Sequence, residues 1–206
     1  MVHTNNPRSF YNIARNISLG LAVVLFASHL IWSRQTIFLF FNQDLGKIGD
    51  LFFTFCTYLA EGWIWIPYFL IVVGLLKKNA KIVLYHFIFS TLLTQIPKLV
   101  IWNQVTRPIA SGIDKNLIHF VSGMKIHQFN SFPSGHTATA FTLFLLTVQL
   151  FEHKTTLIIG LFYAIFCGYS RVYLGQHFPL DVAGGIMVAI LTKEISYRIY
   201  KRSNHV

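Results

Sequence analysis

Charged residues are scarce in this sequence, and acidic residues are the scarcest of them. The 206 residues include only seven Asp and Glu, and charged residues of both signs make up 12%, about half the share in a typical soluble domain. Hydrophobic residues reach 54%, and 20 residues are phenylalanine. The length suits one domain, residues 1–206. A soluble domain of this size could not bury so much apolar surface, so the composition favours a membrane protein.

Cysteine is almost absent, and neither cysteine indicates a metal or redox site. Cys56 and Cys167 lie in apolar stretches, without a CxxC pair or a Cys/His metal-binding spacing. We interpret both as buried, unreactive thiols. No acidic pair suited to Mg²⁺ lies near the motifs described below, so we expect no metal and no other cofactor.

The formal net charge of +10 indicates an anionic partner. A nucleic-acid-binding surface needs its Lys and Arg gathered on one face. Here the basic residues stand in short groups between long apolar runs, which favours anionic lipid headgroups. We therefore expect membrane lipids as partners and no nucleic acid, and we infer no obligate protein partner.

Six apolar segments account for most of the chain, and several approach the roughly 20 residues that a helix needs to cross a bilayer. They span residues 17–33, 61–76, 82–102, 135–151, 155–172 and 178–197. They predict an all-α, polytopic membrane protein with six transmembrane helices. Arg8 and Arg15 precede the first segment, so a cleaved signal peptide is the alternative there. Because five more apolar segments follow, we favour a retained helix.

The basic residues predict the orientation of these helices. If the N-terminus is inside, ten Lys and Arg lie on the inner side and seven on the outer side, and three of those seven belong to the motifs below. The positive-inside rule then places both termini in the cytoplasm. The inner ten are Arg8, Arg15, Lys77, Lys78, Lys81, Lys154, Lys193, Arg198, Lys201 and Arg202.

Two stretches between the segments have amphipathic character. Residues 44–58 could form an interfacial helix packed under the polar site that the next paragraph describes. The stretch from Asn116 to Phe132 mixes apolar residues with His119, Lys125 and His127. It could be a second interfacial helix or a solvated loop, and the sequence leaves both open. Glu61 could contact substrate, cap a helix or face water, and we favour the helix start because Glu is stabilising there.

Polar residues gather at the predicted outer ends of the third to sixth segments. Ionisable groups in or beside a membrane are costly, so their collection on one face indicates function. In chain order they are Lys98, Arg107, Ser134, Gly135, His136, Arg171, His177 and Asp181.

Several of these residues suit an anion. Lys98, Arg107 and Arg171 would put three positive charges around one region, and arginine presents a donor fork that matches phosphate. Ser134 and Gly135 would begin a helix and leave backbone N–H groups free, which is a common phosphate site.

The two histidines supply reactivity. Pro179 suits the first position of a helix, which puts Asp181 in the first turn. There Asp181 could accept a hydrogen bond from one ring nitrogen of His177 and leave the other to attack phosphorus. His136 would protonate the leaving oxygen and then activate water.

The spacing of these residues resembles the type-2 phosphatidic acid phosphatase superfamily, integral-membrane lipid phosphatases related to vanadium haloperoxidases. That family has Lys before Arg-Pro, then Pro-Ser-Gly-His, then Ser-Arg, five residues, His, three residues and Asp. The matching residues are Arg107-Pro108, Pro133-Ser134-Gly135-His136, Ser170-Arg171, His177 and Asp181. One departure exists, because the eight residues Leu99 to Thr106 between Lys98 and Arg107 are two more than usual.

The resemblance implies a metal-independent hydrolase that acts on a lipid phosphate monoester or diphosphate through a phosphohistidine. His177 would be the nucleophile, Asp181 its partner and His136 the general acid. A phosphate cradle would consist of Lys98, Arg107, Ser134, Gly135 and Arg171. Phosphatidate, phosphatidylglycerol phosphate, undecaprenyl diphosphate and lipid A are candidate substrates, and the sequence does not choose among them.

The short chain suits a bacterial plasma (inner) membrane enzyme whose active site faces the periplasm, an expectation by fold analogy. A lipid phosphotransferase on the same scaffold is the first alternative. A non-catalytic lipid-binding or transport protein is the second, but it predicts loss of His136 and His177, and both are present. A haloperoxidase is disfavoured because those relatives are soluble.

Overall fold

The computed structural model describes residues 9–75 and 80–203, and within these ranges it contains helices and loops but no strand. The α-helices are α1 (Phe10–Ile31), α2 (Arg34–Phe41), α3 (Gly46–Tyr58), α4 (Trp65–Leu75), α5 (Ala80–Val100), α6 (Gly135–Phe151), α7 (Lys154–Tyr173) and α8 (Pro179–Ser203). Three short 3-10 turns are η1 (Gly62–Ile64), η2 (Pro108–Ala110) and η3 (Lys115–Leu117). The predicted all-α class is therefore confirmed.

Each of the six predicted segments coincides with a helix. Three of the described helices, α1, α5 and α7, are long and apolar enough to cross a membrane. Helix α3 and the η1–α4 segment pass the same test together, with a bend of 57° between them, and α6 is a shorter apolar helix. The number of spans stays a prediction, because length and composition alone do not decide it for α4, α6 and α8.

Helix α8 owes its less apolar character to its place in the bundle. It packs against α6, α1 and α5, and many of its side chains are buried in protein. A helix enclosed by other helices needs no apolar surface all round. This explains why the last predicted segment carries Lys193 and Glu194 yet continues as far as Ser203.

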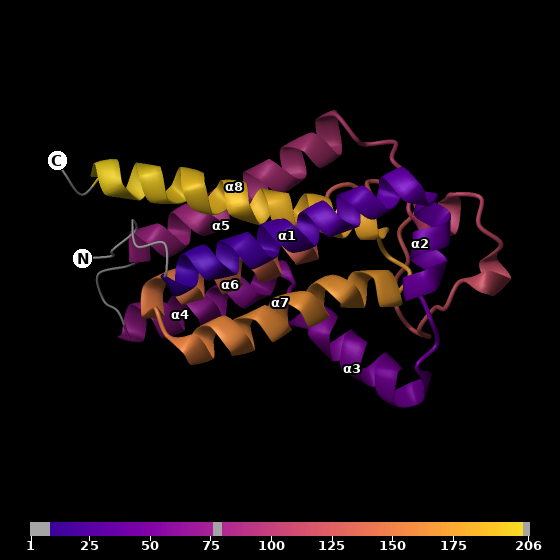
Figure 1. The fold of residues 1–206 in the computed structure, drawn as a ribbon, viewed down its shortest axis with the longest axis horizontal. Helices are drawn as coiled ribbons and strands as arrows, with labels where there is room; N and C mark the ends of the chain where they lie inside the picture. Colours follow the sequence, from indigo (N-terminus) through magenta and orange to yellow (C-terminus); the bar gives the residue numbers. More distant parts are fainter. Residues whose placement is uncertain (1–8, 76–79, 204–206) are drawn as a thin grey trace.

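One end of the bundle collects the polar residues. The chain places there the ends of α5 and α7 and the starts of α6 and α8, together with α2 and the loop from residue 101 to 134. The start of α1 and the end of α8 lie at the opposite end (Figure 1). Arg15 lies in the second turn of α1 at that opposite end, and Lys81 and Lys154 lie there in the first turns of α5 and α7. Arg8, Lys77 and Lys78 lie outside the described residues.

The connecting segments add one missed helix, confirm another and decide between the two alternatives left open for a third. The sequence analysis missed α2, which begins after a break at Trp32, where the Ser33 hydroxyl accepts a hydrogen bond from Thr36 N at 3.1 Å. The helix expected near residues 44–58 is present as α3. The stretch from Asn116 to Phe132 is a loop after η3, so the interfacial-helix alternative is wrong there.

The two cysteines are buried and unpaired, as predicted. Cys56 is 5% exposed and Cys167 is 1% exposed. The Cys167 thiol donates to the Cys56 carbonyl at 3.1 Å, which ties α7 to α3.

A close approach between α8 and α6 depends on glycine. A Cβ atom on Gly185 would lie 2.7 Å from the Ser134 carbonyl oxygen and 2.8 Å from Thr137 Cβ. On the neighbouring Gly184 it would lie 2.4 Å from the Phe132 ring. The start of α6 therefore sits against α8 at a distance that side chains would prevent.

Gly185→Ala is expected to lower both thermal stability and activity. The added methyl would push α8 away from Ser134, and overpacking of this kind costs about 1–3 kcal/mol. Thermal unfolding of the detergent-purified protein measures the effect. Gly20→Ala is the matched control, since a Cβ there meets nothing within 4 Å. Equal unfolding temperatures for the two variants would contradict the packing argument.

Candidate active site

His177 and Asp181 form a buried pair at the start of α8. The exposed fractions are 1% for His177 and 3% for Asp181. Asp181 Oδ2 lies 3.2 Å from His177 Nδ1 and also accepts hydrogen bonds from Phe178 N at 2.9 Å and from Ser131 Oγ at 2.5 Å. The ring is thus held through Nδ1, and Nε2 is left for other chemistry.

The His177 imidazole is held in its uncharged form. Burial lowers its pKa well below the ordinary value, and the nearby charges of Arg107, Lys98 and Arg171 lower it further. An uncharged ring with one nitrogen engaged by a carboxylate has a lone pair on the other nitrogen, which is what a nucleophile requires.

Three buried cations surround this pair. The exposed fractions are 9% for Lys98, 7% for Arg107 and 6% for Arg171. The charges of Arg107, Asp181 and Arg171 all act on Lys98, so the four groups share one region. One buried carboxylate faces three buried cations, and an excess of buried positive charge is stabilised by a bound anion.

Arg107 is fixed by the loop and by the residue before the nucleophile. Its Nη1 donates to the Gln176 carbonyl and to the Gln176 side-chain oxygen, both at 3.2 Å, and its Nε donates to the Phe129 carbonyl at 3.0 Å. The Arg107 backbone N donates to Gln128 O at 2.8 Å. The chain between residues 125 and 130 therefore forms the rim of the site.

Arg171 keeps a buried donor free among the described residues, and Lys98 stands at the end of α5. Arg171 Nη1 donates to Thr57 Oγ1 of α3, and its buried Nε has no hydrogen-bond partner in the part of the chain that the structure describes. Lys98 stands in the last turn of α5 after Pro97. Between Lys98 and Arg107 the chain leaves α5 in a turn, where Ile101 N and Trp102 N both donate to Pro97 O at 2.9 Å.

The start of α6 is joined to the start of α8. Ser134 caps α6 by accepting a hydrogen bond from Thr137 N at 3.4 Å, and the Ser134 backbone N donates to Asp181 O at 2.9 Å. The expectation that the Ser134 N–H is free is therefore wrong. The first turn from Gly135 onward still presents the unpaired N–H groups of a helix N-terminus.

His136 lies at the open side of the site and faces Glu61. Its side chain is 27% exposed, and its Nε2 lies 4.0 Å from Glu61 Oε1. Glu61 precedes η1, but its carboxylate makes no capping hydrogen bond there. Glu61 therefore stands at a helix start, as the favoured alternative expected, but without a side-chain cap.

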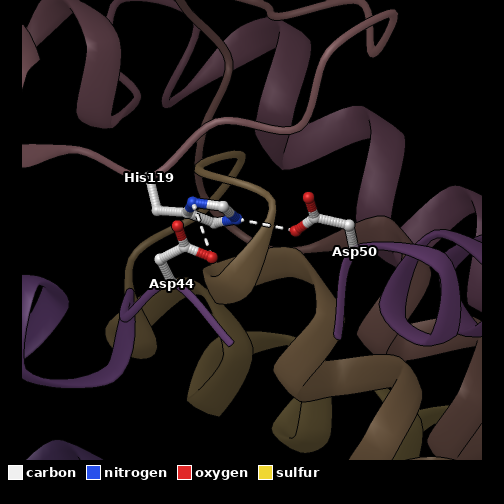
Figure 2. Close-up of side chains that lie close together, drawn as sticks. All are labelled: Asp44, Asp50 and His119. Carbon is white, nitrogen blue, oxygen red and sulfur yellow. Dashed lines mark hydrogen bonds and ion pairs between the residues drawn. The ribbon is translucent and has the colours of Figure 1, made fainter. Parts of the chain in front are cut away.

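One group of side chains could hold a metal ion, but it lies outside the predicted constellation. Asp44, Asp50 and His119 place ligand atoms within 4.8 Å of one another. Figure 2 shows His119 between the two carboxylates, with its Nε2 2.9 Å from Asp50 Oδ1. Asp50 Oδ1 also accepts from the Tyr173 hydroxyl at 2.7 Å, and Asp44 Oδ1 accepts from Gly46 N at 2.7 Å.

We interpret this group as a clamp, because protein donors already occupy one oxygen of each carboxylate. It joins α3, the loop at residue 119 and the end of α7, two residues beyond Arg171. Asn42 strengthens the same junction, since its side-chain amide donates to Val172 O at 3.0 Å and to Tyr173 O at 2.8 Å.

The sequence analysis missed several residues that position the site. Gln176 and Ser131 lie next to the motifs, so their places in the chain were a signal that could have been used. Thr57 had no such signal, because it stands 114 residues from Arg171 in the sequence. These residues hold the functional groups and are not themselves predicted to contact phosphate.

A comparison with family models decides the relationship. The model described as the PAP2 superfamily matches residues 79–205. The chain belongs to the PAP2 superfamily. The matched range includes every residue of the predicted constellation, from Lys98 to Asp181.

Similar proteins and structures agree with this assignment. The chain is 32% identical over 162 residues to the bacitracin transport permease protein BcrC of Bacillus licheniformis, covering 74% of this chain and 73% of that protein. It is 27% identical to the lipid A 4'-phosphatase of Bacteroides thetaiotaomicron, and the match covers 73% of this chain and 69% of that protein. Among solved structures, LpxE of Aquifex aeolicus matches with a TM-score of 0.68 and 30% identity. The match covers 79% of this chain and 93% of the LpxE chain.

A second solved structure extends the similarity over more of the chain. The transmembrane PAP2-type phosphatidylglycerolphosphate phosphatase of Bacillus subtilis matches with a TM-score of 0.62, covering 93% of this chain and 96% of that one. Its 22% identity shows the fold alone. With the apolar helices α1, α5 and α7, this fold makes the PAP2 chain an integral membrane protein.

Proposed function

We propose that this PAP2 protein is a membrane phosphatase that hydrolyses a phosphate monoester or diphosphate of a lipid through a phosphohistidine. The observation that carries the proposal is the buried His177–Asp181 pair within 3.2 Å, surrounded by three buried cations. Related proteins named undecaprenyl-diphosphatase, lipid A 4'-phosphatase and phosphatidylglycerophosphatase B support a lipid substrate.

In the first step His177 Nε2 attacks phosphorus. An N–P bond forms while the bond between phosphorus and the lipid oxygen breaks, and His136 gives its proton to that oxygen. The lipid leaves as an alcohol, or as a lipid monophosphate when the substrate is a diphosphate. Lys98, Arg107 and Arg171 stabilise the charge on the transferred phosphoryl group.

In the second step water attacks phosphorus and releases inorganic phosphate. His136, now without its proton, accepts one from the water, and the N–P bond breaks with its electron pair returning to His177. Gly135 and the first turn of α6 donate backbone N–H groups to the phosphate oxygens throughout, and Ser134 holds that turn in place. No step needs a metal ion.

The site belongs at the periplasmic face of a bacterial inner membrane, with both termini in the cytoplasm and residues 1–206 as one domain. The positive-inside rule supports this orientation, since Arg15, Lys81 and Lys154 lie in the first two turns of helices that start at the end of the bundle opposite the site.

Phosphate release from a lipid panel tests the proposal. Detergent-purified protein is expected to release phosphate from at least one of phosphatidate, phosphatidylglycerol phosphate, undecaprenyl diphosphate and lipid A, and EDTA is expected to leave the rate unchanged. No release from any of these lipids by folded protein would contradict the hydrolase. A reversible loss on chelation would contradict the metal-free mechanism and direct attention to Asp44, Asp50 and His119.

A further inference from the structure

Glu61 is an acidic side chain beside His136 that the proposed mechanism leaves without a role. It lies at the bend between α3 and α4, where the chain turns by 57°. Its Oε1 is 4.0 Å from His136 Nε2, with 39% of the Glu61 side chain and 27% of the His136 side chain exposed. This is the one ion pair that Glu61 forms with the described residues. The pair is therefore placed at the open side of the site, where a lipid would enter.

Three positive charges lie close to His136. Lys98, Arg107 and Arg171 all act on His136 with positive charge. Charges of the same sign disfavour the protonated imidazole, whereas a carboxylate within about 4–6 Å favours it. A general acid must carry its proton before the leaving group departs, so the site needs a negative charge beside His136.

Asp181 is not available for this purpose. Its Oδ2 already accepts hydrogen bonds from Phe178 N and Ser131 Oγ and lies against His177 Nδ1. Glu61 approaches from a different element, and its charge also reaches Arg171. The two carboxylates thus contact different histidines: Asp181 lies against the nucleophile His177, and Glu61 lies against the proposed acid His136.

We propose that Glu61 is a positioning residue that orients His136 and keeps it protonated as the general acid of the first step. This inference rests on the proposed function and assigns a partner to the second histidine of the site. The charges of Arg171, Lys98 and Arg107 act on His136, and His136 acts on His177. Against these groups, Glu61 is the carboxylate that forms an ion pair with His136 among the described residues.

The leaving group makes the proposal testable, because only a poor leaving group needs a proton. An alkoxide departing from phosphatidate is strongly basic, whereas p-nitrophenolate departs from p-nitrophenyl phosphate without protonation. Loss of Glu61 should therefore slow cleavage of the lipid ester much more than cleavage of the aryl ester.

The experiment compares kcat/KM of wild type, Glu61→Gln and Asp114→Asn on short-chain phosphatidate and on p-nitrophenyl phosphate in detergent. Glu61→Gln is expected to lose on the order of tenfold on phosphatidate and less than about threefold on the aryl ester. Asp114→Asn is the matched control, because it removes a carboxylate from the exposed loop at the same end of the bundle. The control is expected to match wild type on both substrates.

The pH profile of kcat/KM gives a second, independent measurement. Without the Glu61 carboxylate, His136 loses its proton at lower pH. The alkaline limb of the phosphatidate profile is expected to move to lower pH by about one unit in Glu61→Gln and to return toward the wild-type position in Glu61→Asp. If Glu61 acted only in folding, Glu61→Gln would change neither the position of the alkaline limb nor the ratio of kcat/KM for phosphatidate to kcat/KM for p-nitrophenyl phosphate.

Equal losses of Glu61→Gln on both esters, no loss on either, or an unmoved alkaline limb would each overturn the proposal. Failure of the proposed function is a different result, since wild type itself would then release no phosphate from phosphatidate or from any other lipid of the panel.

Discussion

Replacing His177 with alanine is expected to abolish turnover while the protein stays folded in the membrane. The nucleophilic nitrogen would be gone, and neither Asp181 nor the three cations can form the covalent intermediate. Loss of the nucleophile from a site of this kind lowers kcat by at least about 10⁴-fold. Because His177 is 1% exposed and adjoins α8, thermal unfolding should accompany the rate measurement to show that the fold survives.

Trapping the intermediate separates loss of chemistry from loss of binding. Wild type quenched during turnover of a ³²P-labelled lipid should carry acid-labile label, as expected of a phosphohistidine, and His177→Ala should carry none. His153→Ala is the matched control, since His153 is exposed and caps α7 at the opposite end of the bundle. Wild-type turnover in His177→Ala, or an equal loss in His153→Ala, would refute the assigned role.

Replacing Asp181 with asparagine is expected to lower the rate by about 10²- to 10³-fold, strongly but less completely than His177→Ala. Asparagine has nearly the same shape and can keep contacts to Phe178 and Ser131, but it carries no charge to orient the imidazole and to stabilise it as positive charge develops. The measurement is kcat/KM on the preferred lipid, together with the yield of labelled phosphoenzyme.

Inhibition by inorganic phosphate tests whether Asp181→Asn slows the chemical step or weakens the binding of phosphate. The substitution removes the buried negative charge that faces Lys98, Arg107 and Arg171, so phosphate should bind at least as tightly as in wild type. Asp114→Asn serves again as the control for a lost carboxylate. A wild-type rate in Asp181→Asn would contradict the pairing, and weaker phosphate inhibition would point to a collapsed site.

The sequence predicted most of the helices because their signals are local. Segment 135–151 coincides with α6 because Ser134 caps its start and apolar residues continue to Phe151. Helix α2 was missed because its eight residues directly follow the first apolar segment, and the break at Trp32 carries neither glycine nor proline. The loop after η3 was left open because its few apolar residues are compatible with an interfacial helix as well.

Part of the site was also predictable from spacing alone. His177 and Asp181 are four residues apart with Pro179 between them, so the start of one helix brings the carboxylate back to the ring. The gathering of Lys98, Arg107 and Arg171 followed from the alternating direction of the helices, which returns every second end to the same face. The catalytic roles of these residues remain predictions that the variants above test.

What the sequence by itself determined is the helical membrane fold and the family, and it predicted which residues would carry the chemistry, because all of these depend on local pattern and spacing. Only the tertiary structure showed that Ser134 N donates to Asp181 O and that Arg171 donates to Thr57. It also showed that Gly185 lets α6 start close to α8 and that Glu61 lies beside His136. Each of these contacts joins residues from different elements, at distances set by how the helices pack, and no local pattern encodes such packing.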